Sequence, residues 1–168
     1  MIDSDENLVL FPKPCFLSIA TGTFRVPDFN VAEINHKVTR RPLLIVELKA
    51  PSTPHNIGGD PYDDPNIAVI EATVEQLKIQ VAHVFSGRSP PSTVIGLIGV
   101  GQLWQYFAFF RATITPTKNA RESPQHFLMR FLSATVPTAS AYFHLGTEES
   151  DNELDTLGEL LTQNHEME

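Results

Sequence analysis

The hydrophobic residues of this chain fall into short runs that predict β-strands, with one long helical pattern between them. The strongest run, PLLIVELKA at residues 42–50, is apolar on both faces over most of its length, which is typical of an internal strand. Two further runs, VIGLIGV at 94–100 and QLWQYFAFFRATIT at 102–115, predict a hairpin that turns at residues 99–101. Weaker strand patterns occupy residues 15–24, 29–34 and 141–145.

A helical pattern over residues 65–86 separates the two strongest strand regions. Asp64 and Pro65 supply an N-cap and a proline at the first helical position, and Gly87 suits the left-handed conformation that ends many helices. One face carries polar side chains at helical spacings of three, four and three, namely Thr73, Gln76, Gln80 and His83. This stripe is either a solvent-facing edge or the partner of polar groups on the sheet.

The C-terminal part of the chain is acidic. Eight of the 20 acidic residues, and no lysine or arginine, lie within residues 148–168, which predict an amphipathic helix that begins at Ser150 or Asp151. Its apolar stripe consists of Leu154, Leu157, Leu160 and Leu161. We expect these leucines to pack on the body of the protein; in a second interpretation, the acidic helix folds over the functional site as a mimic of DNA. Residues 121–136 fit a helix less clearly.

Length and charge predict one domain, residues 1–147, followed by this acidic helix or tail. The net charge of −8 belongs to residues 148–168, because residues 1–147 hold 12 acidic and 12 basic residues. A neutral domain lacks the basic surplus typical of DNA-binding proteins, so charge alone leaves the partner open. The acidic N-terminus, the single cysteine and the lack of a long apolar run favour an intracellular protein, cytoplasmic or nuclear, with no membrane partner.

Two charged residues near the end of the 42–50 run raise a chemical question. Glu47 and Lys49 project from the same side of the predicted strand, and charges on an internal strand are costly unless they are paired. The two residues therefore either reach solvent at the end of the strand, as an ordinary ion pair, or take part in chemistry.

A hairpin with the preceding strand would bring a second acid to this side. If Ile34 opposes Arg41 next to the turn, then Asp28 stands opposite Glu47 and both carboxylates project to one face. A divalent cation would relieve the repulsion between them, and oxygen ligands of this kind suit Mg²⁺ or Mn²⁺. Lys49, on the same face, would orient the attacking water or stabilise the charge that develops on a phosphate.

Pro27-Asp28 and Glu47-Leu48-Lys49, whose two acids are nineteen positions apart, resemble the motif of the PD-(D/E)XK nuclease superfamily. The resemblance implies that Asp28, Glu47 and the backbone carbonyl of Leu48 bind the metal ion. It also implies that Lys49 assists the water that attacks the phosphodiester bond.

The same resemblance implies a fold. That fold is α+β, with a restriction-endonuclease-like core in which a mixed β-sheet contains a long crossover helix, and the aromatic β-hairpin is added to it. Many members of the superfamily carry a glutamine on the crossover helix four residues before a tyrosine; Gln76 is the matching position here, and Gln80 stands in place of the tyrosine. The family's first helix is expected to be missing or reduced to a turn, because two prolines lie in the residues before 15. The sequence as a whole also resembles fungal proteins with this core, as a member with a shortened N-terminus.

These patterns support two hypotheses for the function. The first is a metal-dependent phosphodiester hydrolase that acts on DNA, or a degenerate descendant of one, with Asp28, Glu47, Lys49 and Gln76 as its site residues. The alternative is a non-catalytic module that retains the nuclease-like fold and uses its aromatic strand to bind other proteins or to form a homodimer. The polar loop at 51–65 and the glycines of the hairpin are more typical of solvated and turn structure than of metal or phosphate sites.

Overall fold

The fold is known from a computed structural model, which describes residues 8–12, 16–17, 24–25, 29–34, 40–51, 60–87, 90–113 and 124–166. Most of its strands form one mixed sheet, in the order β1 (Leu8–Pro12), β4 (Phe29–Ile34), β5 (Arg40–Lys49), β6 (Thr93–Val100), β7 (Leu103–Phe110) and β8 (Thr138–Ala139). A further strand, β9 (Phe143–His144), also pairs with β7. β5 and β6 are parallel, and the other pairs of this sheet are antiparallel.

The predicted strand at 42–50 and the predicted hairpin at 94–115 are present as β5, β6 and β7. The prediction of one strand over residues 15–24 is wrong, because two short strands, β2 (Phe16–Leu17) and β3 (Phe24–Arg25), pair with each other instead. β7 is also shorter than predicted, since it ends at Phe110 and continues as a single 3₁₀ turn, η2 (Arg111–Thr113).

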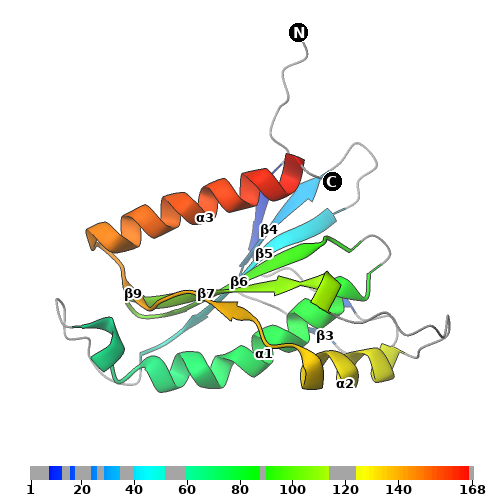
Figure 1. Ribbon diagram of the computed structural model, residues 1–168, viewed down its shortest axis with the longest axis horizontal. Coiled ribbons are helices and arrows are strands. Elements are labelled where there is room, and N and C mark those ends of the chain that lie inside the picture. The colour runs from blue at the N-terminus through cyan, green and yellow to red at the C-terminus, as the bar shows by residue number, and fades with distance from the viewer. Residues whose placement is uncertain are drawn as a thin grey trace, which may run out of the picture.

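Helices cover the main sheet on both faces. α1 (Ile67–Phe85) connects the parallel strands β5 and β6, which need such a crossover connection. Figure 1 shows α1 and α2 (Pro124–Ala134) on one side of the sheet and α3 (Glu148–Glu166) on the other. The fold is therefore α+β, with a mixed sheet between two helical layers and a long crossover helix.

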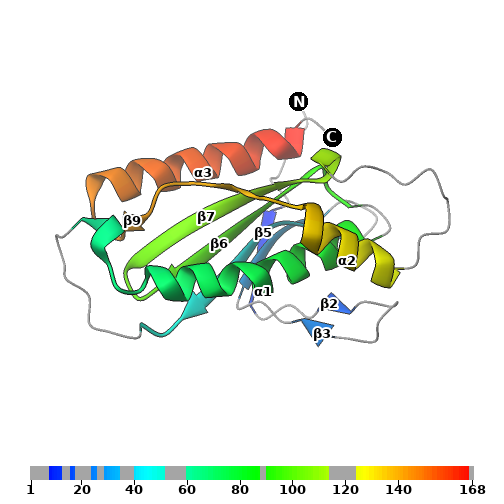
Figure 2. The ribbon, with the colours of Figure 1, turned by 60° about the horizontal axis from the view of Figure 1, so that its bottom comes forward.

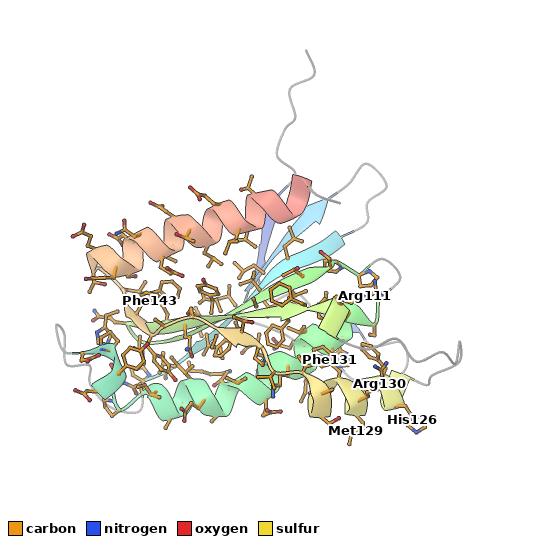
Figure 3. The ribbon with its side chains drawn as sticks, in the orientation of Figure 1. Arg111, His126, Met129, Arg130, Phe131 and Phe143 are labelled. Carbon is orange, nitrogen blue, oxygen red and sulfur yellow. The ribbon has the colours of Figure 1, made fainter. Side chains whose placement is uncertain are left out.

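The two faces of the sheet have separate hydrophobic cores. Between the sheet and α1, Ile45, Leu77, Ile98 and Phe131 belong to one buried cluster. Figure 3 shows Phe131 on the side of α2 that faces the sheet, whereas Met129 points away from it. On the α3 side, Leu44, Ile95 and Leu157 form a second and smaller cluster.

The ends of α1 differ from the prediction. The helix begins at Ile67, and Asn66 rather than Asp64 occupies the N-cap position, because residues 64–67 first make a turn in which Ile67 N donates to Asp64 O at 3.1 Å. At the other end, Gly87 follows the helix without adopting a positive φ. Among the described glycines, the left-handed conformation belongs instead to Gly101, in the turn between β6 and β7, and to Gly146.

The acidic helix α3 begins at Glu148, earlier than predicted. Thr147 explains this start, because its Oγ1 accepts a hydrogen bond from Ser150 N at 3.2 Å and so caps the first turn. Leu157 is buried against the sheet, but Leu154 and Leu160 stay 39% and 37% exposed. None of the helices in the described part of the chain is both long and apolar enough to cross a membrane.

Candidate functional site

The side chain of Glu47 lies buried between the central strand β5 and helix α1. Because side chains alternate along a strand, Glu47 shares the α1 face with Ile45, whereas Leu44 and Val46 face α3. Only 2% of the Glu47 side chain is exposed, and the Lys49 side chain, one strand repeat further on, is 30% exposed. The predicted shared face of these two charges is therefore correct. Figure 2 shows the end of β5 next to α1.

Two glutamines of α1 complete a connected group of polar side chains. Glu47 Oε2 accepts hydrogen bonds from Lys49 Nζ at 2.9 Å and from Gln76 Nε2 at 3.0 Å. Glu47 Oε1 accepts from Gln80 Nε2, and Lys49 Nζ also donates to Gln76 Oε1 at 3.3 Å. We call Glu47, Lys49, Gln76 and Gln80 the polar cluster.

The polar cluster is a buried ion pair with amide support, which distinguishes it from an ordinary pair on the surface. A carboxylate removed from water is strongly destabilised unless opposite charge and hydrogen-bond donors replace its hydration. Lys49 supplies the charge, and the two glutamines supply donors to both carboxylate oxygens. The partial exposure of Lys49 leaves its ammonium within reach of solvent and of any molecule that approaches this end of β5.

Gln80 is the most enclosed member of the polar cluster. Its side chain is fully buried, and its carbonyl oxygen Oε1 has no hydrogen-bond partner within the described structure. The orientation of this amide follows from its neighbour, because turning it over would place Oε1 against a carboxylate oxygen of Glu47. The structure therefore leaves one buried acceptor open beside a buried carboxylate.

Near Asp28, the predicted second acid, the pairing of β4 with β5 has the expected register. This holds as far as Phe29, the first described residue of β4. Phe29 pairs with Val46 and Val31 pairs with Leu44, as the prediction requires. A β-bulge between Val31 and Ala32 then shifts the pairing, so Ile34 opposes Arg40 and not Arg41. Asp28 itself lies outside the described residues, so its predicted place opposite Glu47 stays a prediction.

Of the three ligands predicted for the metal site, Glu47 and Leu48 lie within the described residues. Leu48, whose backbone carbonyl was the third predicted ligand, pairs with Gly99 of β6 and lies between Glu47 and Lys49 in β5. Within the described ranges, no group of three or more histidine, cysteine, aspartate or glutamate side chains is arranged to hold a metal ion. The Glu47 carboxylate and the Gln80 Oε1 are oxygen ligands of the type that Mg²⁺ and Mn²⁺ prefer.

The polar stripe predicted on α1 divides between two roles. Gln76 and Gln80 face the sheet and bind Glu47, so the interpretation of the stripe as a partner for the charged strand is confirmed for them. Thr73 instead donates its hydroxyl to Val69 O of its own helix at 2.7 Å. Gln80 was not among the predicted site residues, although its spacing of four from Gln76 was a usable signal.

A second buried polar group joins the start of α1 to β9. His144 Nε2 lies 3.1 Å from Asp64 Oδ2, and Asp64 Oδ1 accepts from Asn66 N at 2.8 Å and Asn66 Nδ2 at 2.9 Å. The sequence indicated Asp64 as a helix cap or part of a solvated loop, and no local pattern connects it with His144. Because both side chains are buried and paired, they fasten the loop before α1 to the sheet.

The other sequence signals have structural roles. Trp104, Phe107 and Phe109 of the aromatic strand are buried in the core, whereas Phe110 is 43% exposed. Arg111 follows that strand at the surface (Figure 3). The site that remains is the polar cluster, which one strand and one helix build. No protein-family model matches the chain, and comparisons with curated proteins and with solved structures also found no match.

Proposed function

We propose that the protein is a metal-dependent phosphodiester hydrolase that acts on DNA, with the polar cluster as the core of its active site. One observation carries this proposal: a buried carboxylate at the end of a central strand is held by a lysine two residues later and by two amides of the crossover helix. Asp28, Glu47 and the Leu48 carbonyl are the proposed ligands of Mg²⁺ or Mn²⁺. Lys49 and Gln76 are the proposed residues on the substrate side.

The order of the elements around the cluster supports the resemblance to restriction-endonuclease-like proteins. The hairpin β4–β5 leads through the crossover helix α1 to the parallel strand β6, and β6 forms a hairpin with the aromatic strand β7. In that resemblance the motif acids lie on the hairpin and the supporting glutamine lies on the crossover helix. Glu47 and Gln76 occupy those elements here.

The chemistry of the chain's own residues fits the hydrolysis of a phosphodiester. A bound divalent ion would supply Lewis-acid activation of the phosphate and of the attacking water. Glu47 is already held in one orientation by donors to both oxygens, so it would hold its ligand with little rearrangement. The Lys49 ammonium, which is partly exposed, would stabilise the negative charge that develops on the phosphate.

The position of the acidic helix is compatible with a polyanionic substrate. α3 lies on the face of the sheet opposite to the polar cluster, so the helix does not cover the proposed site (Figure 1). The interpretation of this helix as a DNA mimic that folds over the site is therefore wrong. Its leucines hold it against Leu44 and Ile95, on the other side of β5 and β6.

A second function is favoured by one observation, the charge balance of the polar cluster. Lys49 already neutralises Glu47, and the carboxylate already accepts three hydrogen bonds, as a purely structural ion pair would. We therefore keep as the alternative a non-catalytic module that retains the nuclease-like fold. Its contacts would have to use residues such as Phe110, because most of the aromatic strand is buried.

Cleavage of labelled DNA distinguishes the two functions. Single- and double-stranded DNA would be incubated with the protein in Mg²⁺ or Mn²⁺, beside Glu47→Ala and the control Glu75→Ala, which removes an exposed acid of the same helix that bears the glutamines. We expect cleavage by the unaltered protein, its loss by a factor of about 100 or more in Glu47→Ala, and no loss in Glu75→Ala. Circular dichroism would verify that the variants are folded. Cleavage that persists in Glu47→Ala contradicts this active site, and no cleavage with either ion favours the non-catalytic module.

A further inference from the structure

The two glutamines of the polar cluster are bonded differently, although they lie one helical turn apart on α1. Gln76 uses both ends of its amide, since Nε2 donates to Glu47 and Oε1 accepts from Lys49. Gln80 uses only its nitrogen, which donates to Glu47, and its oxygen is without a partner among the described groups. The hydrogen-bonding groups of the Gln76 amide are therefore both used, whereas the Gln80 amide has an oxygen without a donor.

The open oxygen is an unusual feature of a well-packed core. The side chain of Gln80 is fully buried, and its neighbours in the helix, Leu77 and Val81, are fully buried in the same hydrophobic core. An orphaned buried acceptor is destabilising, and native structures leave few of them. The hydrogen bond to Glu47 accounts for the nitrogen of this amide, but nothing in the described structure accounts for its oxygen.

The location of the oxygen indicates what it binds. The nitrogen and the oxygen of an amide share one carbon atom, so the bond from Nε2 to Glu47 places the whole amide group next to this carboxylate. A buried oxygen acceptor without a donor, in an amide beside an anionic carboxylate, is stabilised by an electron-poor partner. Carboxylate and amide oxygens are both common ligands of hard divalent cations.

We propose that Gln80 is a metal ligand of this site, with its Oε1 binding the same divalent cation as Glu47. This inference rests on the proposed function and extends it, because it adds a ligand from the crossover helix to those expected from the hairpin. It also gives the two glutamines different roles. Gln80 binds the ion, whereas Gln76 holds Lys49 in position.

Titration of the whole chain with Mn²⁺ tests the proposal without relying on catalysis. Isothermal titration calorimetry would compare the unaltered protein with Gln80→Met, which keeps the length of the side chain but removes its oxygen, and with Gln80→Glu, which restores an oxygen ligand. Glu75→Gln serves as the control for the loss of a polar or charged group elsewhere on α1. We expect Gln80→Met to weaken Mn²⁺ binding about tenfold or more, Gln80→Glu to retain it, and Glu75→Gln to leave it unchanged.

A thermal unfolding experiment separates binding from a merely structural role. If Gln80 only supports the fold, Gln80→Met lowers the melting temperature equally with and without Mn²⁺. If it is a ligand, the rise in melting temperature that Mn²⁺ causes shrinks in Gln80→Met. The same rise grows in Gln80→Glu, because two facing carboxylates repel each other until the cation binds.

The outcomes distinguish this inference from the proposed function. If the unaltered protein binds Mn²⁺ and cleaves DNA, but Gln80→Met binds the ion equally well, then Gln80 is not a ligand and the function stands. If the unaltered protein binds no Mn²⁺, the proposed function fails and this inference fails with it. Should Gln80→Met not fold, Gln80→Glu still decides, because loss of Mn²⁺ binding in that folded variant contradicts the proposal.

Discussion

Replacing Glu47 and Gln80 by methionine, singly and together, tests whether the polar cluster stabilises or destabilises the folded protein. Methionine has nearly the length of both side chains and adapts to irregular space, so it removes the polar atoms without leaving a large cavity. Within the described structure, the bond to Glu47 is the only hydrogen bond of the Gln80 side-chain amide. Each single change therefore removes a buried hydrogen-bond partner from the other residue.

The loss of unfolding free energy in each single variant depends on which of the remaining polar groups water can solvate. In Glu47→Met, Lys49 and Gln76 are partly exposed and can be solvated, but the fully buried Gln80 amide cannot, so we expect a loss of roughly 1–3 kcal/mol in the free energy of unfolding. In Gln80→Met, the Glu47 carboxylate keeps two donors but loses the third, which should cost about 2 kcal/mol.

The free energy of unfolding of the double variant is the decisive measurement. If the two losses were independent, they would add to about 3–5 kcal/mol, but the double variant removes both halves of one interaction and leaves no orphaned amide from it. We therefore expect it to lie within about 1 kcal/mol of the unaltered protein, or above it, since replacing buried polar groups with apolar ones is often neutral or stabilising.

Urea unfolding followed by far-ultraviolet circular dichroism, in metal-free buffer containing EDTA, measures these free energies. Midpoints are comparable only if the slope of the unfolding free energy against urea stays constant across the four proteins. Strict additivity of the two single losses would refute the reasoning, because it would mean that Glu47 and Gln80 do not interact. A double variant more stable than the unaltered protein would instead indicate that the polar cluster is retained for function.

Three further predictions concern packing and titration elsewhere in the fold. Gly96→Ala should destabilise the protein by roughly 1–3 kcal/mol in urea unfolding, because an added Cβ would lie 2.7 Å from Leu77 Cδ1. The same change should cost less when it is made in a Leu77→Ala background, where that contact is absent. Ser150→Ala should cost about 1–3 kcal/mol, because the buried Trp104 Nε1 would lose the hydroxyl that accepts its hydrogen bond at 2.9 Å. Burial, together with a hydrogen bond to a carboxylate of α3, raises the pKa of Tyr106 to about 12, so the stability linked to its neutral form should be complete below pH 10 and decline as the pH rises to 12.

Each of these predictions has a result that contradicts it. Equal stability of Gly96→Ala and the unaltered protein would show that Leu77 can move aside without cost. Thr156→Ala, an exposed change on the same helix as Ser150, is the matched control, and an equal loss in both would remove the role of the Trp104 bond. For Tyr106, the alkaline absorbance change near 295 nm should lose its highest-pH component in Tyr106→Phe, and an unchanged profile would contradict the raised pKa.

Local sequence patterns were sufficient for the features that depend on near neighbours in the chain. The alternation of side chains along a strand determined that Glu47 and Lys49 share one face, and the apolar runs identified β5, β6 and β7. The helical spacing of Gln76 and Gln80 placed both on one side of α1. These regularities repeat every two or 3.6 residues, so they can be recognised without knowing what packs against them.

Long-range packing decided what those faces contact. The sequence left open whether the α1 stripe met solvent or the sheet, and only the crossover that stacks α1 on β5 buried Glu47 and enclosed Gln80. The bulge in β4, the pairing of Asp64 with His144 and the choice of face for α3 likewise join residues that are distant in the chain. The sequence by itself determined the elements and the side of each on which the polar groups lie. Tertiary structure decided which groups became buried partners, because burial depends on surfaces that separate elements bring together.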